Sequence, residues 1–152
     1  MKTAILYFMV LTLFMGCNSD ESKPQNNDIV GQWKLISFVD DKNGTILTED
    51  DFENSNTITI NFKEDFTYDG QTGHNIFSGN YEVNDSETVL ILGGDEGIWT
   101  EVGETEWGNL FFDTLNLNYN PTTQTLDNEY NVANDALKIY YAEKEYMKFV
   151  KI

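Results

Sequence analysis

Short runs with the two-residue alternation of β-strands constrain the fold of this chain more than any other feature. The clearest is residues 57–62, where Ile58, Ile60 and Phe62 share one side. In an earlier run, alternation places Trp33 and Leu35 on one face and Phe38 on the other. Because few helical patterns separate the runs, we expect an antiparallel sheet. That earlier run covers residues 29–39, and the further strand-like runs are residues 66–68, 75–83, 88–92, 129–132, 137–141 and 146–150.

One segment has the period of a helix instead. Its apolar stripe recurs at i, i+3, i+4, i+7 and i+8, beginning at Trp107 and ending at Leu115. The fold class we predict is therefore mainly β with one helix (α+β). We expect an antiparallel, barrel-like curved sheet with a single amphipathic helix packed against it, since closure hides strand edges. The predicted core combines Trp33, Ile58, Ile60, Phe62, Leu110, Phe111 and Leu115, with Trp107 over it at the helix start.

Cys17 is the only cysteine of the chain, and it follows an apolar run that is free of charge from Ala4 to Met15. That run is shorter than the roughly 20 apolar residues of a membrane-spanning helix, but it fits the apolar centre of a signal peptide. Gly16-Cys17 has the small-residue–cysteine pattern at which bacterial lipoproteins are cleaved and acylated. We expect acyl chains on Cys17 to anchor the protein in a membrane.

The polar segment that follows the cysteine reads as a flexible tether. The predicted organisation is a lipoprotein signal peptide at residues 1–16, a tether at residues 17–27 and a β domain at residues 28–152. Asn18 is not the aspartate that retains some lipoproteins at the inner membrane, so we expect an outer-membrane lipoprotein. Ser19-Asp20-Glu21 resembles a surface-export tether, and the periplasmic and surface-exposed faces both stay open.

The charge of the chain excludes several classes of partner. Its formal net charge is −17, and it contains no arginine. Nucleic acid requires lysine and arginine to neutralise its phosphates, so we expect no nucleic-acid partner. Anionic lipid head groups are repelled in the same way, which leaves the acyl chains as the membrane contact. A protein partner in the envelope or a small apolar ligand stays possible.

Few residues suit catalysis or metal binding. His74 is the only histidine and has no obvious serine or cysteine partner, so we expect it to be a turn residue. The acidic loops near Asp40 and Asp51 could hold a hard cation, but solvated loop charge is the simpler interpretation. We therefore predict no catalytic residue, no cofactor and no metal site.

Two stretches resemble META-domain proteins. Gly31-Gln32-Trp33-Lys34-Leu35 resembles the opening of that family, and the segment from Gly73 to Tyr81 resembles its G-C-N-x-x-x-G-x-Y motif, with His74 in place of the cysteine. The resemblance implies a secreted or envelope protein without an established activity. The residues that carry it form a structural motif of Gly31, Trp33, Gly73, Asn75, Gly79 and Tyr81.

Elementary chemistry also gives these motif residues structural roles. The glycines permit backbone angles or close approaches that a side chain forbids. Asn75 can bond its own turn, and Tyr81 offers an apolar body with a polar tip. We expect a non-enzymatic, lipid-anchored protein with a role in binding, envelope maintenance or stress.

The alternative is a lipocalin-like carrier of a small apolar ligand, because Gly31-Gln32-Trp33 also resembles the G-x-W of lipocalins. Against it, the arginine that packs on that tryptophan in lipocalins cannot exist in this chain. A carrier needs an apolar pocket of roughly 300 Å³ or more, so the barrel interior distinguishes the two hypotheses.

Overall fold

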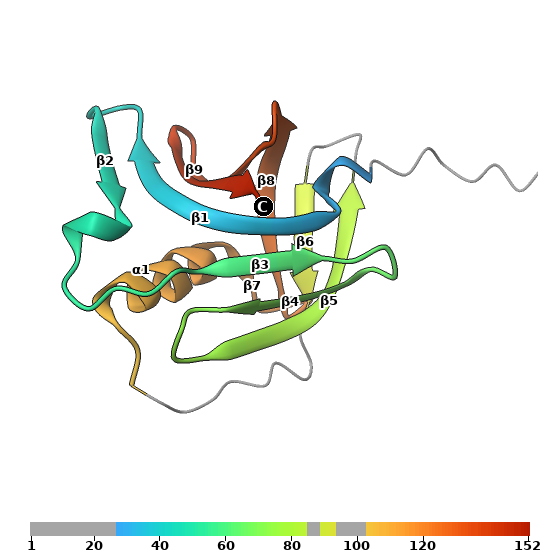
Figure 1. Ribbon diagram of the computed structural model, residues 1–152. Helices are drawn as coiled ribbons and strands as arrows, with labels where there is room; N and C mark the ends of the chain where they lie inside the picture. Colours follow the sequence, from blue (N-terminus) through green and yellow to red (C-terminus); the bar gives the residue numbers. More distant parts are fainter. Residues whose placement is uncertain (1–26, 85–88, 94–102) are drawn as a thin grey trace, which may run out of the picture.

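Eight antiparallel strands form a closed barrel in the computed structural model (Figure 1), which describes residues 27–84, 89–93 and 103–152. Each strand pairs with the next along the barrel, and the last pairs with the first, so the predicted antiparallel barrel is confirmed. An eight-stranded up-and-down barrel is the architecture of lipocalins. The barrel strands are β1 (Gly31–Asp40), β3 (Thr59–Phe62), β4 (Thr67–Gln71), β5 (Ile76–Asn84), β6 (Val89–Gly93), β8 (Thr125–Ala133), β9 (Ala136–Ala142) and β10 (Glu145–Lys151).

Two strands outside the barrel path were not predicted. β2 (Thr45–Thr48) pairs with the end of β1 after a turn at Gly44, and β7 (Tyr119–Asn120) pairs with the start of β8. Both are short, and most of their side chains are exposed, so neither has an apolar alternation to reveal it. Short 3-10 helices lie at Asn27–Ile29, Glu49–Asp51 and Asn116–Asn118.

The face assignment predicted for β1 is wrong at Phe38. The pairing of β1 with β10 shifts register between Leu35 and Ser37, which marks a bulge. One extra residue reverses the alternation beyond it. Trp33, Leu35 and Phe38 consequently all belong to the buried core.

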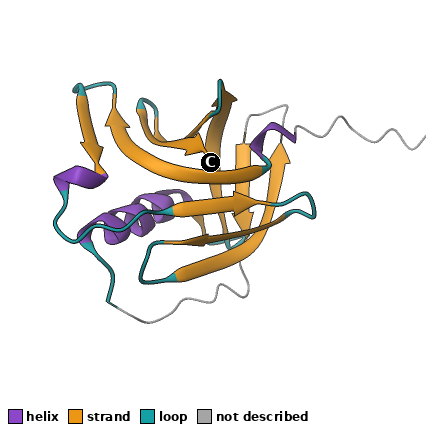
Figure 2. Ribbon diagram, viewed as in Figure 1, coloured by secondary structure: helices purple, strands orange, loops and turns teal. Residues whose placement is uncertain are grey.

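The predicted helix is α1 (Glu106–Leu115), the single α-helix among the described residues. It begins at Thr105, whose hydroxyl accepts a hydrogen bond from the Gly108 N–H at 3.0 Å, and it ends before Asn116. Figure 2 shows it at the end of the barrel where β3 begins. Trp107 packs against Phe38 at 5.0 Å between ring centres, and Phe111 packs against Phe77 at 5.5 Å.

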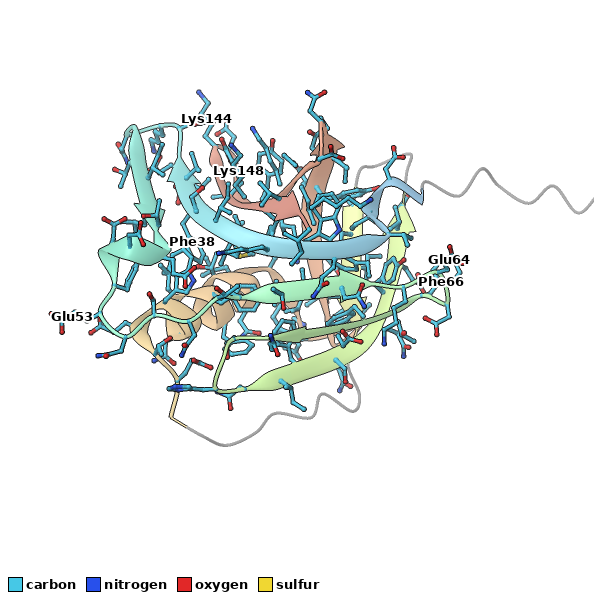
Figure 3. The ribbon with its side chains drawn as sticks, in the orientation of Figure 1. Phe38, Glu53, Glu64, Phe66, Lys144 and Lys148 are labelled. Carbon is cyan, nitrogen blue, oxygen red and sulfur yellow. The ribbon has the colours of Figure 1, made fainter. Side chains whose placement is uncertain are left out.

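The predicted core is confirmed, with two adjustments. Leu110 is only partly buried at its margin, whereas Trp107 is fully buried rather than a cover at the edge. Side chains from every barrel strand and from α1 meet in one continuous cluster (Figure 3). These side chains fill the described part of the barrel interior.

In the described part of the chain, no helix has the length and apolar character needed to span a membrane.

Candidate ligand-binding groove

A groove of 390 Å³ lies on the outer wall of the barrel, over β1, β3, β4 and β5. Strand alternation explains which side chains line it. Ile58, Ile60 and Phe62 point into the core, so Thr59 and Asn61 between them point outward. We call this feature the wall groove; its lining residues are Gln32, Thr59, Asn61, Asp69, Gly70, Gln71, Ile76, Phe77 and Ser78.

The wall groove is built from rows of residues that face one another across the strands. In one row, Asn61 pairs with Gln32 on β1 and with Asp69 on β4, and Asp69 pairs with Ser78 on β5. Directly paired residues on one face of a sheet have Cβ atoms about 5 Å apart. The row therefore presents four polar side chains at sheet spacing.

A second row lies beside the first. It runs through Lys34, Thr59, Gln71 and Ile76 in the same strand order. Thr59 is 7% exposed although it faces outward, whereas Ile76 is 51% exposed. The groove thus has a polar centre and an apolar residue at its β5 edge.

Most polar side chains of the wall groove have unused hydrogen-bonding capacity. Within the described residues, the side chains of Gln32, Asn61, Gln71 and Ser78 have no hydrogen-bond partner in the protein. Each amide offers two donor hydrogens and an acceptor oxygen, and each hydroxyl can donate and accept. Such a set can hold a ligand by several hydrogen bonds at once.

The lysines beside the wall groove are bound to carboxylates. Lys63 forms an ion pair with Asp69, and the hydrogen bond that its ammonium donates to this carboxylate, together with the carboxylate charge, raises the pKa of Lys63. Lys34 lies 3.6 Å from Glu49. The wall groove therefore offers no strong attraction to an anion.

The predicted motif residues do not line the wall groove, and they lie in separate parts of the barrel. Trp33 is fully buried, and its indole N–H donates to the Ile29 carbonyl at 2.7 Å. The Lys151 ammonium lies 5.3 Å from the centre of the Trp33 ring. A Cβ at Gly31 would lie 2.8 Å from the Lys151 side chain, so glycine leaves room for this contact. The sequence excluded the arginine that packs on this tryptophan in lipocalins, and a lysine lies over the ring instead.

Asn75 ties the β4–β5 hairpin to the start of α1. Its side-chain amide donates to the Glu104 carboxylate at 2.6 Å, and the Thr72 hydroxyl donates to the same oxygen. Gly73 turns this hairpin with a φ of +94°, and a Cβ there would lie 2.3 Å from Asn56. The backbone N–H of Asn75 donates to the Thr72 hydroxyl at 3.1 Å, so Asn75 does bond its own turn. Its side-chain amide, however, binds Glu104, which lies outside the motif.

The hydrogen bonds of this tie favour the ionised form of Glu104. Burial raises the pKa of its carboxyl, but the hydrogen bonds from Thr72, Asn75 and the Thr105 N–H lower it, and the net direction is downward. Thr72 is fully buried, and Asn75 and Thr105 are nearly so. The tie therefore fixes the start of α1 at the end of the barrel.

The last two motif residues support the middle and far end of β5. A Cβ at Gly79 would lie 2.2 Å from the Gly93 carbonyl oxygen, so β5 and β6 approach too closely there for any side chain. The Tyr81 hydroxyl donates to the Lys63 carbonyl at 2.7 Å, and its ring packs on Phe62 at 5.0 Å. These contacts give both residues structural roles.

The remaining candidates form no chemical site among the described residues. His74 is exposed, and its Nδ1 lies 2.9 Å from the Gly103 carbonyl oxygen. Asp40 accepts from the Lys42 and Asn43 N–H groups, and Asp51 accepts from Thr48. No group of three potential metal ligands occurs in the described part of the chain. Cys17 and the predicted tether lie outside the described residues, except for Asn27, which begins a 3-10 helix.

Sequence reasoning missed the wall groove for an identifiable reason. Its residues come from four strands, and outward-facing positions of a strand look like ordinary solvated surface. The sequence indicated only that Thr59 and Asn61 point outward, because they alternate with Ile58, Ile60 and Phe62 on the inner face.

No family model and no curated protein matches this chain. Solved structures do resemble it. A DUF4847 family protein from Bacteroides vulgatus has a TM-score of 0.52 and 19% identity, covering 80% of this chain and 92% of that one. A lipocalin-like protein from Bacteroides uniformis has a TM-score of 0.49 and 16% identity, covering 82% of this chain and 99% of that one. The first likeness is one of fold alone, and none of these comparisons supports the META resemblance.

Proposed function

We propose that this chain is a non-enzymatic binding protein of the cell envelope, built on a lipocalin-like barrel and anchored through Cys17, and that its ligand binds in the wall groove. The observation that carries the proposal is the groove itself. It holds 390 Å³ and presents amide and hydroxyl side chains without protein partners. Polar groups that converge on a concave surface can fix the orientation of a ligand and give specificity.

The barrel favours the lipocalin-like alternative over the META hypothesis. Eight sequential antiparallel strands close on one another, and Lys151 covers Trp33 at the seam. The arginine that packs on the opening tryptophan was the feature that the lipocalin resemblance lacked in the sequence, and Lys151 supplies a cation at that place. The lipocalin-like reading is therefore the better supported of the two.

Because side chains fill the barrel interior, we place the ligand site on the barrel wall and not inside the barrel. Trp33, Phe62, Trp107, Phe111 and Phe149 are all no more than 1% exposed, and they occupy the space that a carrier would leave open. A ligand inside the described barrel would have to displace such side chains, at a cost of several kcal/mol for each large core residue. The wall groove requires no such displacement.

A fragment screen by nuclear magnetic resonance tests the proposal. The full acylated chain, labelled with ¹⁵N and held in detergent micelles, is titrated with a library of small neutral and charged polar molecules. We expect hits to shift the amide signals of Gln32, Asn61, Gln71 and Ser78. Hits confined to other surfaces, or none at millimolar concentration, would contradict the proposal.

One observation favours a second candidate, which is an apolar ligand carried inside the barrel. The Trp107 indole N–H and the Asn128 amide nitrogen are buried and have no hydrogen-bond partner within the described residues. Unpaired buried donors are rare, and the carboxylate of a fatty acid would accept hydrogen bonds from them. A brominated fatty acid would quench tryptophan fluorescence if it entered beneath α1, and this quenching would fall in Trp107→Phe. Absence of quenching would exclude this candidate.

A further inference from the structure

We propose that the ligand of the wall groove is a neutral oligosaccharide, an inference that rests on the proposed function. The groove residues supply the chemistry. Gln32, Asn61 and Gln71 each present an amide with donors and an acceptor, and Ser78 presents a hydroxyl. A sugar carries neighbouring hydroxyls that each donate and accept, so amides and hydroxyls can satisfy them in pairs.

Charge makes an anionic ligand a poor fit. The net charge of the chain is −17, and it contains no arginine to grip a phosphate or carboxylate. The nearest lysines, Lys34 and Lys63, already form ion pairs with Glu49 and Asp69. A neutral ligand avoids the repulsion, and the Asp69 carboxylate can still accept hydrogen bonds from its hydroxyls.

The direction of the groove indicates an elongated ligand. The row from Gln32 to Ser78 crosses four adjacent strands. With strands about 4.8 Å apart, that row extends over roughly 14 Å. A ligand that lies across the strands can therefore contact several side chains in sequence, as a chain of linked sugar rings would.

The backbone around the wall groove argues against a peptide. Peptides commonly bind barrels and sheets by adding a strand to a free edge. β3 and β4 each pair with neighbours on both sides, so the floor of the groove has no free edge. Recognition must therefore come from side chains, and Ile76, which is 51% exposed, offers an apolar surface for the C–H face of a sugar ring.

Calorimetry with defined oligosaccharides tests the inference. The full acylated chain is held in a detergent without sugar head groups and titrated with maltohexaose, cellohexaose, xylohexaose, mannohexaose and an acidic oligogalacturonate. We expect at least one neutral hexasaccharide to bind and the oligogalacturonate to show no binding. Binding of the acidic ligand alone, or of none of the five at millimolar concentration, would overturn the inference.

Variants locate the binding on the wall groove. Asn61→Ala with Gln71→Ala removes two outward amides, and we expect affinity to fall about tenfold or more. Gln32→Ala tests the β1 side of the groove separately. Asn131→Ala is the matched control, because Asn131 is an exposed amide on β8 outside the groove. Unchanged affinity in the double variant and in Gln32→Ala, with unfolding midpoints preserved, would overturn the inference.

The two proposals can fail separately. If polar fragments shift the groove signals but no neutral oligosaccharide binds, the carbohydrate inference is wrong and the binding function stands. If neither fragments nor oligosaccharides contact the groove, both are wrong.

Discussion

The Lys151 ammonium lies 5.3 Å from the centre of the Trp33 ring, at the seam where β10 pairs with β1. The contact joins the first and last strands of the barrel through a cation and the face of an aromatic ring. The contact depends on Gly31 as well as on Lys151 and Trp33, because a Cβ at position 31 would lie 2.8 Å from the Lys151 side chain.

Replacing the charge at this seam gives the first prediction. Lys151→Met keeps most of the apolar stem and removes the ammonium, so we expect a loss of about 0.5–1 kcal/mol of unfolding free energy, the usual range for an exposed cation–π contact. Lys151→Arg should retain the stability. Denaturant unfolding followed by tryptophan fluorescence measures both, and equal stability of Lys151→Met and the parent protein would contradict the cation–π role.

The second prediction ranks two aromatic positions. Phe111 is 1% exposed and packs between Phe77 and Phe112, so Phe111→Ala should cost about 3–5 kcal/mol. His74 is exposed, so His74→Ala should lose less than about 1 kcal/mol from its contact with the Gly103 carbonyl. Urea titrations of the two variants test the ranking; a reversed order would show that His74 is a core partner.

The third prediction concerns acid. The net effect of burial and hydrogen bonding lowers the pKa of Glu104 in the folded protein below its ordinary value of 4.5. A lowered folded pKa means that Glu104 stabilises the protein above the unfolded pKa, and that this contribution is lost as the pH falls through the folded pKa. We therefore expect stability to decline below about pH 4.5 partly through this one carboxyl.

Glu104→Gln separates that contribution from the rest. At neutral pH this variant should lose roughly 1 kcal/mol of unfolding free energy. Hydrogen bonds to a charged group stabilise the fold more than those to a neutral group, and exposure to solvent reduces the difference. As the pH falls through the folded pKa of Glu104, the stability of Glu104→Gln should approach that of the parent protein. Glu106→Gln, an exposed neighbour on α1, is the control. If the parent and Glu104→Gln run parallel across the whole pH range, the tie is not electrostatic.

The fourth prediction concerns the anchor. Cys17→Ser should leave a product that carries no fatty acid and no longer partitions into detergent, because Cys17 is the only cysteine of the chain and the predicted site of acylation. Labelling cells with radioactive palmitate and separating the phases of a detergent extract measures both effects. Label that persists on the serine variant would refute the anchor. Protease treatment of intact cells then distinguishes a surface face from a periplasmic one.

Alternation over buried strands was the part of the fold that sequence could predict. Ile58, Ile60 and Phe62 define an inner face, and the single apolar stripe of α1 requires a partner, so a helix against a curved sheet follows. The bulge beyond Leu35 could not be predicted, because it depends on pairing with β10 and has no signature in β1.

The sites depend on distant parts of the chain, which explains why they were harder to predict. Glu104 meets Asn75 across 29 residues, and Lys151 meets Trp33 only after the barrel closes. The wall groove combines four strands whose outward residues show no local motif. The motif that sequence did single out, from Gly73 to Tyr81, supports the hairpin and the barrel wall rather than a ligand site.

The pairing of β10 with β1 also makes closure of the barrel depend on two strands that lie far apart in the sequence. Among the described residues β1 is the first strand and β10 is the last, so the barrel cannot close before β10 pairs. Until then, a growing sheet exposes β1 as an open edge, to which another chain could add. Topologies dominated by such distant pairings fold slowly and are prone to aggregate while incomplete. An incomplete barrel therefore keeps one edge of β1 open to pairing with another chain until the seven-residue strand β10 pairs with it.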